Sequence, residues 1–486
     1  MAITDIATPT AWLGIIATAL LIYYLASTIY SWSRLRSVPG PFIAGISSLY
    51  EISSTATGQE GWLYNDLAKK YGHLVRISPN TILTDDPDVL RRMCGARGTY
   101  GKDAFYSGSF KHPDHDTMFS TTEIPAHDAI KAKLAGPYGG RETLAMEPIV
   151  DDIIRALNQH IRDELSQGPG RARIVNFADI ANFFTMDVIT RVAFGSELGF
   201  LRTHSDVHGL MAALRATMRT YTIPMNVPWL RSITTSNYFL KAFGPKIKVD
   251  AYSVTESWKK NSKNDSSLEP LTRKTYCEAL FAMSAGSDTT AATIRCTMLY
   301  LMTNPRVYHK LKQVVREAVD EGRVSSPIKH DEAKQFPYLQ AVIYEGLRMR
   351  PPTPIKFPKV VPPQGDEIDG KFIPGGTAVG WNLIPMMRSP RHWGHDGELF
   401  RPERFTEADE DKRASMERLV EMVFGHGRFG CAGKPLAFME LNKVYFELFR
   451  YFDFQLVNPM KPWHSELWSI WMDDAFMVQI SESVAD

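Results

Sequence analysis

A long uncharged stretch near the start of the sequence restricts where the chain can fold. No charged residue lies between Ile6 and Ser33, and residues 11–30 read AWLGIIATALLIYYLASTIY. Twenty helical residues span about 30 Å, the thickness of the hydrocarbon core of a bilayer. A cleaved signal peptide is the alternative, but it would have a shorter apolar core preceded by basic residues. We therefore interpret residues 1–33 as an N-terminal membrane anchor with its helix over about 11–30.

The residues after this segment predict its orientation and its connection to the rest of the chain. Arg34 and Arg36 follow the apolar span, and basic residues favour the cytosolic side, so we expect residues 34–486 to be cytosolic. Next comes SVPGPF (37–42), in which two prolines flank a glycine and end any helix leaving the membrane. We interpret residues 34–45 as a stiff Pro/Gly hinge, with an ordinary turn as the alternative.

The remaining residues, 46–486, contain no repeat, low-complexity tract or change of composition, so we expect a single domain. The formal net charge is only +1, and no run of five like charges occurs, which argues against a nucleic-acid partner. The cysteines (Cys94, Cys277, Cys296 and Cys431) lie far apart and form no C-x-x-C pair. They therefore predict neither a disulfide framework nor a zinc site.

Hydrophobic periodicity predicts a mainly α-helical fold with small β-sheets. Apolar residues recur at three-and-four spacing in stretches such as 65–72, 86–95, 147–166, 206–221 and 307–322. The expected strands are short and lie at 73–78, 80–85, 371–382, 454–458 and 476–480. A polar, turn-rich stretch at 261–270 predicts an exposed loop before the longest helix.

That helix, predicted over 271–304, carries an unusual polar segment, AGSDTT (285–290), in its middle. Gly, Ser, Asp and Thr all form helices less well than average, so the segment gives up local helical stability. Gly286 allows a close approach to the helix, while Asp288 and Thr289 supply an acid and an alcohol for a proton relay. A polar kink packed against another helix is the alternative interpretation.

Two further stretches place charged residues near prolines. In YLQAVIYEGLRMRPP (338–352), Glu345 and Arg348 are three residues apart and can pair on one helical face. FRPERF (400–405) places Arg404 in a loop. Taken alone, the Glu345–Arg348 spacing favours a solvated surface pair worth a few tenths of a kcal/mol, and FRPERF by itself is equally unremarkable.

The stretch FGHGRFGCAG at 424–433 has two interpretations. Its core, GHGRFG, fits G-x-G-x-x-G, a dinucleotide-binding turn that follows a strand and precedes an acidic residue at the end of the next strand. Here Asp453 comes before the next strand, and about 60 residues remain, too few for a doubly wound sheet. Alternatively, the glycines present Cys431 at the start of a helix, where the dipole and free N–H groups stabilise a thiolate that can bind haem iron. A buried structural thiol remains a third possibility.

In this order, these stretches resemble the motifs of the cytochrome P-450 superfamily, and the resemblance covers nearly the whole chain. AGSDTT is similar to the oxygen-activation motif on that family's central helix, and Asp288 and Thr289 take its catalytic positions. Glu345, Arg348 and Arg404 match the triad that locks the haem-binding core. The resemblance implies a long central helix over haem b, with Cys431 as the axial ligand to the iron. The other positions implied to contact the cofactor in these motifs are Phe424, Gly427, Gly433 and Gly286.

The sequence departs from the family at the residues that hold the haem propionates. The family usually has an arginine two residues before the cysteine, where this chain has Phe429. The helix that typically offers Trp and Arg reads HDAIK (127–131). Because two buried carboxylates without cations would be costly, we expect a set of basic residues to share them, namely His127, Lys131, Lys359 and Arg428.

The resemblance also implies an activity and partners. It implies insertion of one oxygen atom of O2 into a lipophilic small molecule, with electrons from NADPH through NADPH-cytochrome P-450 reductase and cytochrome b5 as a further candidate donor. The anchor resembles that of endoplasmic-reticulum members, and several stretches are similar to fungal biosynthetic enzymes of terpenoid, polyketide or alkaloid secondary metabolism. A haem-thiolate isomerase or dehydratase that does not use O2 is the alternative, and a non-catalytic haem-binding membrane protein is another.

By the same resemblance, five residues are expected to line the substrate pocket. They come from the central helix and from the segment after the helix that carries Glu345, and they are Phe281, Ala282, Ala285, Ile355 and Phe357. The apolar, proline-bent stretch 220–230 is expected to form a lid that touches the membrane.

Overall fold

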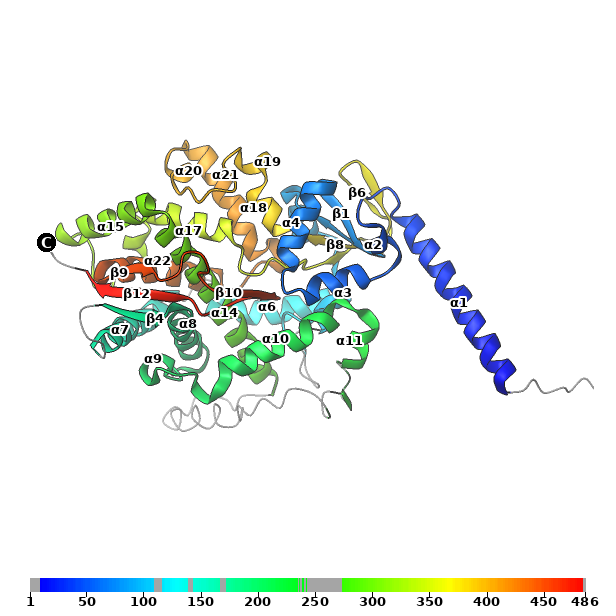
Figure 1. The fold of residues 1–486 in the computed structure, drawn as a ribbon, viewed down its shortest axis with the longest axis horizontal. Coiled ribbons are helices and arrows are strands. Elements are labelled where there is room, and N and C mark those ends of the chain that lie inside the picture. The colour runs from blue at the N-terminus through cyan, green and yellow to red at the C-terminus, as the bar shows by residue number, and fades with distance from the viewer. Residues whose placement is uncertain are drawn as a thin grey trace, which may run out of the picture.

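The chain folds into a helical body from which one long helix projects (Figure 1). A computed structural model describes residues 9–483 apart from 109–115, 139–142, 167–171, 235, 237, 240–241 and 243–272. The projecting helix is α1 (Pro9–Arg34), and its Trp12–Arg34 segment is long and apolar enough to cross a membrane. The predicted anchor helix is therefore present and extends four residues beyond the expected end at residue 30.

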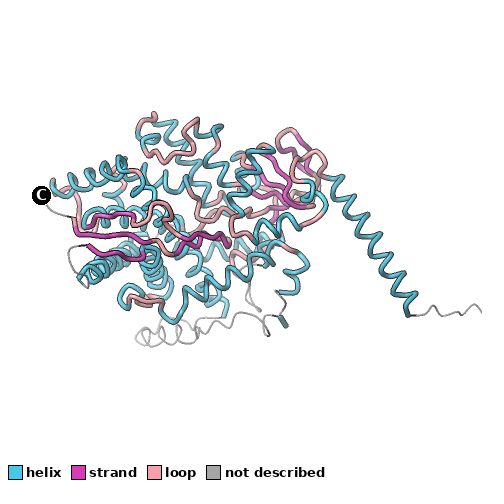
Figure 2. Tube along the Cα trace, in the orientation of Figure 1, coloured by secondary structure: helices cyan, strands magenta, loops and turns pink. Residues whose placement is uncertain are grey.

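Helices account for most of the body, as Figure 2 shows. In chain order after α1, they are α2 (Phe42–Ile46), α3 (Leu49–Ala56), α4 (Glu60–Tyr71), α5 (Pro87–Cys94), α6 (Ile124–Tyr138), α7 (Thr143–Ser166), α8 (Phe177–Phe194), α9 (Phe200–Thr203), α10 (Leu210–Asn226), α11 (Pro228–Thr234), α14 (Arg273–Thr303), α15 (Pro305–Asp320), α16 (His330–Ala333), α17 (Pro337–Met349), α18 (Leu383–Arg388), α19 (Pro390–Trp393), α20 (Glu403–Thr406), α21 (Glu410–Val420) and α22 (Lys434–Tyr451). Short 3₁₀-helices are η1 (Ala104–Gly108), η2 (Val207–Gly209), η3 (Glu421–Phe424) and η4 (Gly427–Phe429).

The strands are short and form small sheets. They are β1 (Leu74–Ser78), β2 (Thr81–Thr84), β3 (Gly101–Lys102), β4 (Ala172–Asn176), β5 (Lys359–Val360), β6 (Asp366–Ile368), β7 (Lys371–Ile373), β8 (Ala378–Trp381), β9 (Phe452–Leu456), β10 (His464–Trp468), β11 (Ile470–Asp474) and β12 (Met477–Glu482). The largest sheet has the order β1-β2-β8-β5-β3, with β2 and β8 parallel and the other pairs antiparallel. The sheet β4-β12-β9 lies at the opposite end of the body, and β10 pairs with β11 and β6 with β7 (Figure 1).

The long helix α14 passes through the centre of the body and contacts α8, α17, α22 and β11. Helix α8 is buried over almost its whole length, because it carries apolar residues on every face. It begins where the side chain of Asn176 accepts a hydrogen bond from the amide of Ala178, and it ends at Gly195 with φ 79°. A helix that is apolar all round belongs in a core, and α8 accordingly packs along α14.

Arginine side chains hold α1 against the body, and Arg34 of α1 donates a hydrogen bond of 2.7 Å to the carbonyl of Gly375. Arg76 of β1 donates hydrogen bonds to the carbonyls of Ser31 at 2.8 Å and Trp32 at 3.1 Å, both in α1. The same guanidinium binds the carbonyls of Gly45 at 3.1 Å and Pro79 at 2.7 Å. The end of the anchor helix is therefore tied to the first sheet of the body.

Some local predictions need correction or lie outside the described residues. The stretch 419–424, which would be a strand in a dinucleotide-binding unit, completes α21 and forms η3. The interpretation of GHGRFG as a nucleotide turn is therefore wrong, because the strand that precedes such a turn is missing. In the stretch 220–230, α10 continues through Pro224 to Asn226 before α11 begins. The loop predicted at 261–270 lies outside the described residues.

Candidate active site

The cysteine-containing loop between η3 and α22 is closed on itself. The amide of Cys431 donates a hydrogen bond of 2.7 Å to the carbonyl of Phe424. Gly425 and Gly427 have φ of 75° and 54°, the left-handed region that favours glycine. A Cβ on Gly427 would also collide with the carbonyl oxygen of Cys94, so this position has no room for a side chain. The glycines thus allow the loop to fold back tightly against α5.

The pKa of the Cys431 thiol is subject to opposing influences. The thiol is accessible to solvent, although the surrounding protein desolvates it and raises its pKa. Hydrogen bonds from the amides of Gly433 and Lys434 oppose this rise, as does the charge of Lys131. Gly433 caps α22, and a Cβ there would lie 3.9 Å from the sulfur. These N–H groups and charges lower the pKa of the thiol, as is expected at a helix N-terminus.

On α14, the hydroxyl of Thr289 donates a hydrogen bond of 2.7 Å to the carbonyl of Ala285. The neighbouring Asp288 is partly accessible, and burial raises the pKa of its carboxyl against the opposing charges of Arg295 and Arg215. An alcohol and an acid with a raised pKa are thus adjacent on the central helix.

Gly286 has a contact different from the expected one. A Cβ on Gly286 would lie only 2.7 Å from the Cδ1 atom of Ile189 on α8. The close approach that the glycine permits in this structure is therefore that of a neighbouring helix. Gly286 thus serves packing between α8 and α14, and its contact with the cofactor stays a prediction.

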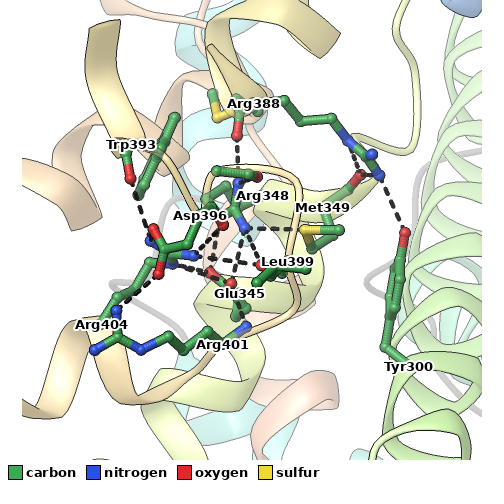
Figure 3. A network of polar contacts seen from close by, with 12 residues as sticks. Tyr300, Glu345, Arg348, Met349, Arg388, Trp393, Asp396, Leu399, Arg401 and Arg404 are labelled. Carbon is green, nitrogen blue, oxygen red and sulfur yellow. Dashed lines mark hydrogen bonds and ion pairs between the residues drawn. The ribbon is translucent and has the colours of Figure 1, made fainter. Parts of the chain in front are cut away.

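Glu345, Arg348 and Arg404 meet in one buried network (Figure 3). Arg348 holds both carboxylate oxygens of Glu345, at 2.7 and 2.8 Å, and Arg404 reaches the same oxygens at 3.1 and 3.2 Å. Arg348 also donates to the carbonyls of Met387 at 2.7 Å and Gly397 at 2.6 Å. Both side chains of the Glu345–Arg348 pair are fully buried, which excludes the alternative of a solvated surface pair.

The acid that completes this network was not identified by the sequence analysis. Asp396 accepts a hydrogen bond of 3.0 Å from Arg404 through its carboxylate and another of 3.0 Å through its carbonyl. The ring of Trp393 lies 4.9 Å from the guanidinium carbon of Arg348. Trp393 ends the short helix α19 and Asp396 lies in the loop after it, and neither carries a motif, so only the tertiary structure identifies them.

The basic residues expected near the propionates divide into two groups. Lys131 donates to the carbonyls of Arg428 at 2.7 Å and Gly430 at 2.9 Å, within the cysteine loop. Lys359 is buried, and its ammonium lies 4.5 Å from the centre of the Phe429 ring. The ring of His127 lies 5.3 Å from the same ring. The structure thus brings Lys131, Lys359 and His127 to the cysteine loop.

Arg428 is placed elsewhere. Its guanidinium donates to the carbonyl of Ala96 at 2.6 Å and lies 3.3 Å from the carboxylate of Asp128. These partners occupy the side chain, because the backbone at 428 directs it toward the loop that follows α5. The role of Arg428 at a propionate stays a prediction, which these contacts do not support.

The expected pocket residues lie in an apolar, aromatic region. Ile355 belongs to a buried cluster with Phe105 and Met225, and Phe357 packs against this cluster with φ 41°, in the left-handed region. Phe281 of α14 stacks on Phe119 with 5.6 Å between ring centres. Ala282 and Ala285 lie on α14, where both are partly buried. The two segments that were expected to line the pocket are therefore joined through Phe119 and Phe357, whose ring centres are 6.2 Å apart.

These residues fit a haem. A haem presents an iron that accepts a soft thiolate, and two carboxylates that require positively charged donors. The structure provides an accessible thiol at Cys431, and it gathers basic side chains around Phe429, two residues earlier in the same loop. One of these, Lys102, was missed by the sequence analysis, because a lysine in a two-residue strand carries no motif.

The fold and this site define a haem-thiolate protein, and comparison with known proteins agrees. The family profile "Cytochrome P450" matches residues 41–251 and 245–480. The chain therefore belongs to the cytochrome P450 family, and it is a monooxygenase of that family.

The relatives are fungal enzymes. Cytochrome P450 monooxygenase aba1 of Botryotinia fuckeliana is 40% identical over 469 residues, which cover 92% of each chain. Cytochrome P450 monooxygenase ABA1 of Pyricularia oryzae is 37% identical and covers 98% of both chains. Cytochrome P450 monooxygenase abl1 of Leptosphaeria maculans is also 37% identical, over 92% of this chain and 82% of its own.

Proposed function

We propose that this monooxygenase inserts one oxygen atom of O2 into a lipophilic small molecule, as a tailoring step of fungal secondary metabolism. The observation that carries this proposal is the aromatic and aliphatic character of the residues around Phe119 and Ile355. Burying a flat apolar molecule against such side chains is favourable by about 25 cal/mol per Å² of surface removed from water. The names of the fungal relatives support a biosynthetic role.

When bound, the haem with its cysteinate ligand supplies the activation of dioxygen. The residues Asp288 and Thr289 move the protons. Because the Thr289 hydroxyl donates its proton to the Ala285 carbonyl, its oxygen remains free to accept a hydrogen bond. Burial raises the pKa of the Asp288 carboxyl against the opposing charges of Arg295 and Arg215, so its protonated form is favoured more than in water and can serve as a proton donor.

We assign structural roles to the other motif residues. Cys431 would hold the haem iron through its thiolate, Gly427 lets the loop pack against α5, and Gly433 caps α22 beside the sulfur. Phe424 closes the loop through its carbonyl, while its ring lies 5.4 Å from that of Phe438 on α22. The triad of Glu345, Arg348 and Arg404 holds α17 against the segment that precedes the loop. Lys131, Lys359 and His127 would bind the propionates.

The electron donors and the cellular location of the enzyme are part of the same proposal. We propose that NADPH supplies electrons through NADPH-cytochrome P-450 reductase, with cytochrome b5 as a second donor. Residues 1–33 form a single-pass anchor in the endoplasmic reticulum, residues 34–45 a hinge, and residues 46–486 a cytosolic catalytic domain. The exposed apolar side chains of α1 support the anchor.

The first experiment is a reduced-minus-CO difference spectrum of membranes that carry the wild type or Cys431→Ala. A red-shifted Soret band that the variant lacks is expected, because the thiolate ligand produces it. An unchanged band in the variant, or a wild type without haem, would overturn the assignment.

The second experiment tests the reaction class. The same membranes, supplied with reductase and NADPH, are incubated with apolar metabolites under isotopically labelled dioxygen. Incorporation of one labelled atom per product supports the proposal. Turnover that needs neither NADPH nor O2 would instead indicate a haem-thiolate isomerase or dehydratase.

A further inference from the structure

Two histidines and a glutamate converge where α7 passes the segment that follows α9. His160 and Glu164 are four residues apart on α7 and therefore share one face of that helix. His204 directly follows α9, and the ligand atoms of the three side chains all lie within 4.8 Å of one another. The rings of His160 and His204 stack with 4.0 Å between their centres. The haem site described above uses none of these residues.

The hydrogen bond of His160 leaves its second ring nitrogen available. Its Nδ1 lies 2.8 Å from the carbonyl of Leu201, and because a carbonyl only accepts, Nδ1 carries the proton. In the neutral ring Nε2 then holds a lone pair, and among the described residues this atom has no hydrogen-bond partner. Burial lowers the pKa of His160 and so favours the neutral form. A ring N–H bonded to a backbone carbonyl is the usual support of a histidine that binds a metal through its other nitrogen.

The other two ligand groups are already adjacent. Nδ1 of His204 lies 3.0 Å from one oxygen of Glu164, close to the separation of about 3.3 Å between two ligands of a tetrahedral zinc ion. The second oxygen of Glu164 lies 3.1 Å from Nε of Arg173 on β4, which orients the carboxylate. The carboxylate of Asp163, 3.9 Å from Nε2 of His204, adds a negative charge beside the cluster. The side chains of His204 and Glu164 are 27% and 21% exposed, so an ion can enter from the solvent.

The segment that carries His204 is held in place independently of this cluster. The carboxylate of Asp187 on α8 accepts hydrogen bonds of 2.8 to 3.0 Å from the amides of residues 199–201. Together with the hydrogen bond from His160, these contacts fix α9 against α7 and α8, which lie beside it (Figure 1). His204 then adopts φ 52°, a left-handed conformation that few residues other than glycine adopt. The backbone thus sets the positions of both histidines before any ion binds.

We propose that His160, Glu164 and His204 bind a zinc ion, which fastens α9 to α7. Imidazole and carboxylate are ligands that zinc takes in proteins, and two histidines with one glutamate leave a fourth position for water. The ion takes the place of the proton between Nδ1 of His204 and Glu164, and Nε2 of the same ring then carries the proton. This second metal site is separate from the haem assignment, does not rest on it and has a structural role.

The test measures zinc uptake by the holoenzyme, in which Cys431 is occupied by haem. Protein is dialysed against micromolar Zn²⁺, and its zinc content is measured by atomic absorption. We expect one zinc ion per chain in the wild type, and binding weaker by about 10–100-fold or more in His204→Asn and Glu164→Gln. Asparagine tolerates the left-handed conformation at position 204, and glutamine keeps the shape of Glu164, so both variants should fold.

His208→Asn is the matched control. His208 is an exposed histidine with φ 57°, four residues further along the chain, and its replacement should leave zinc binding unchanged. Thermal unfolding gives a second readout, because an ion that binds only the folded chain raises the melting temperature of the wild type and of the control but not of the other two variants. A wild type that takes up no zinc, or an equal zinc content in all four proteins, would overturn the proposal. Failure of the haem assignment would appear separately, as a wild type without the red-shifted CO band.

Discussion

The carboxylate of Asp473 accepts hydrogen bonds from both terminal nitrogens of Arg350, at 2.9 and 2.8 Å. Arg295 of α14 reaches the same carboxylate at 3.2 Å, and all three side chains are buried. These three residues therefore join the β10–β11 hairpin to the central helix and to the end of α17. Removing one partner of such a group leaves an uncompensated charge in the interior.

The stability contributed by Asp473 should depend on pH. Burial alone would raise the pKa of Asp473, but the charges and hydrogen bonds of Arg350 and Arg295 outweigh it and lower the pKa to about 2 from 3.8. Because the folded-state pKa is depressed, this stabilisation is present above pH 3.8 and is lost as the pH falls toward 2. It is on the order of 2 kcal/mol. We expect Asp473→Asn to lower the urea midpoint at neutral pH, with a gap to the wild type that narrows below about pH 4.

Asp474→Asn is the control for this measurement. Asp474 lies half-exposed beside His464 at the surface, so its loss should change the midpoint little. A gap between the wild type and Asp473→Asn that stays constant from neutral pH down to about pH 3 would contradict the predicted titration.

Arg348→Lys should weaken the haem-binding core although it preserves the charge. Lysine cannot reproduce the paired hydrogen bonds to Glu345 together with those to the carbonyls of Met387 and Gly397. We expect a loss of about 2–4 kcal/mol and a lower haem content. Thermal unfolding and haem per protein check this. Arg391→Lys, at an exposed residue 3.6 Å from Asp86, should leave both unchanged.

Thr289→Ala should retain the fold and the haem but uncouple NADPH oxidation from product formation. Alanine is a better helix former than threonine, so the helix remains, while the hydroxyl that assists proton transfer is lost. We expect product formed per NADPH to fall by about tenfold or more, with hydrogen peroxide released in its place. Thr293→Ala, one turn further along α14, removes a hydroxyl bonded to the Thr289 carbonyl and should keep the coupling close to that of the wild type. Equal coupling in both variants would argue against a role for Thr289.

Gly427→Ala should disrupt the cysteine loop. A methyl group there requires an alanine at φ 54° and collides with the Cys94 carbonyl. We expect reduced haem content and a lower melting temperature. Gly433→Ala should be tolerated, since φ is −83° and the new Cβ would make ordinary contact with the sulfur. Normal haem content in Gly427→Ala would show that the loop relaxes more easily than its packing indicates.

Arg76→Met should loosen the connection between the anchor and the body. The substitution removes the hydrogen bonds to the carbonyls of Ser31, Trp32 and Gly45. We expect limited proteolysis of membranes to release a soluble catalytic domain several times faster than from the wild type. Arg91→Met, at an exposed pair with Asp88, provides the control. Equal release rates in all three proteins would mean that the prolines alone make the joint stiff.

Much of the architecture was predictable, because periodicity and charge report local structure. The anchor helix, the strands near residues 74–84 and the central helix follow from apolar spacing, and the structure contains them. The pairing of Glu345 with Arg348 was equally consistent with the surface until burial was known. Their spacing fixes which face of α17 they share, but not what packs against that face.

The rest of the site depends on contacts between distant segments, which no local pattern encodes. Gly286 lies in a motif that predicts a cofactor contact, yet Ile189 of α8 fills the space beside it. Arg428 lies closest in sequence to the missing arginine but turns toward Ala96. Lys102 lies more than 300 residues from the cysteine in the sequence, and only the pairing of β3 with β5 places it opposite Lys359.

The strand that carries Arg76 has a wider consequence. Strand β1 is one edge of the five-stranded sheet, and β3, with Lys102, is the other. The end of α1 and Lys102 are therefore connected through one five-stranded sheet. Under the proposed membrane anchoring, this sheet would set the orientation of the catalytic domain at the lipid surface, so that a substrate leaving the bilayer would meet the same face of the molecule.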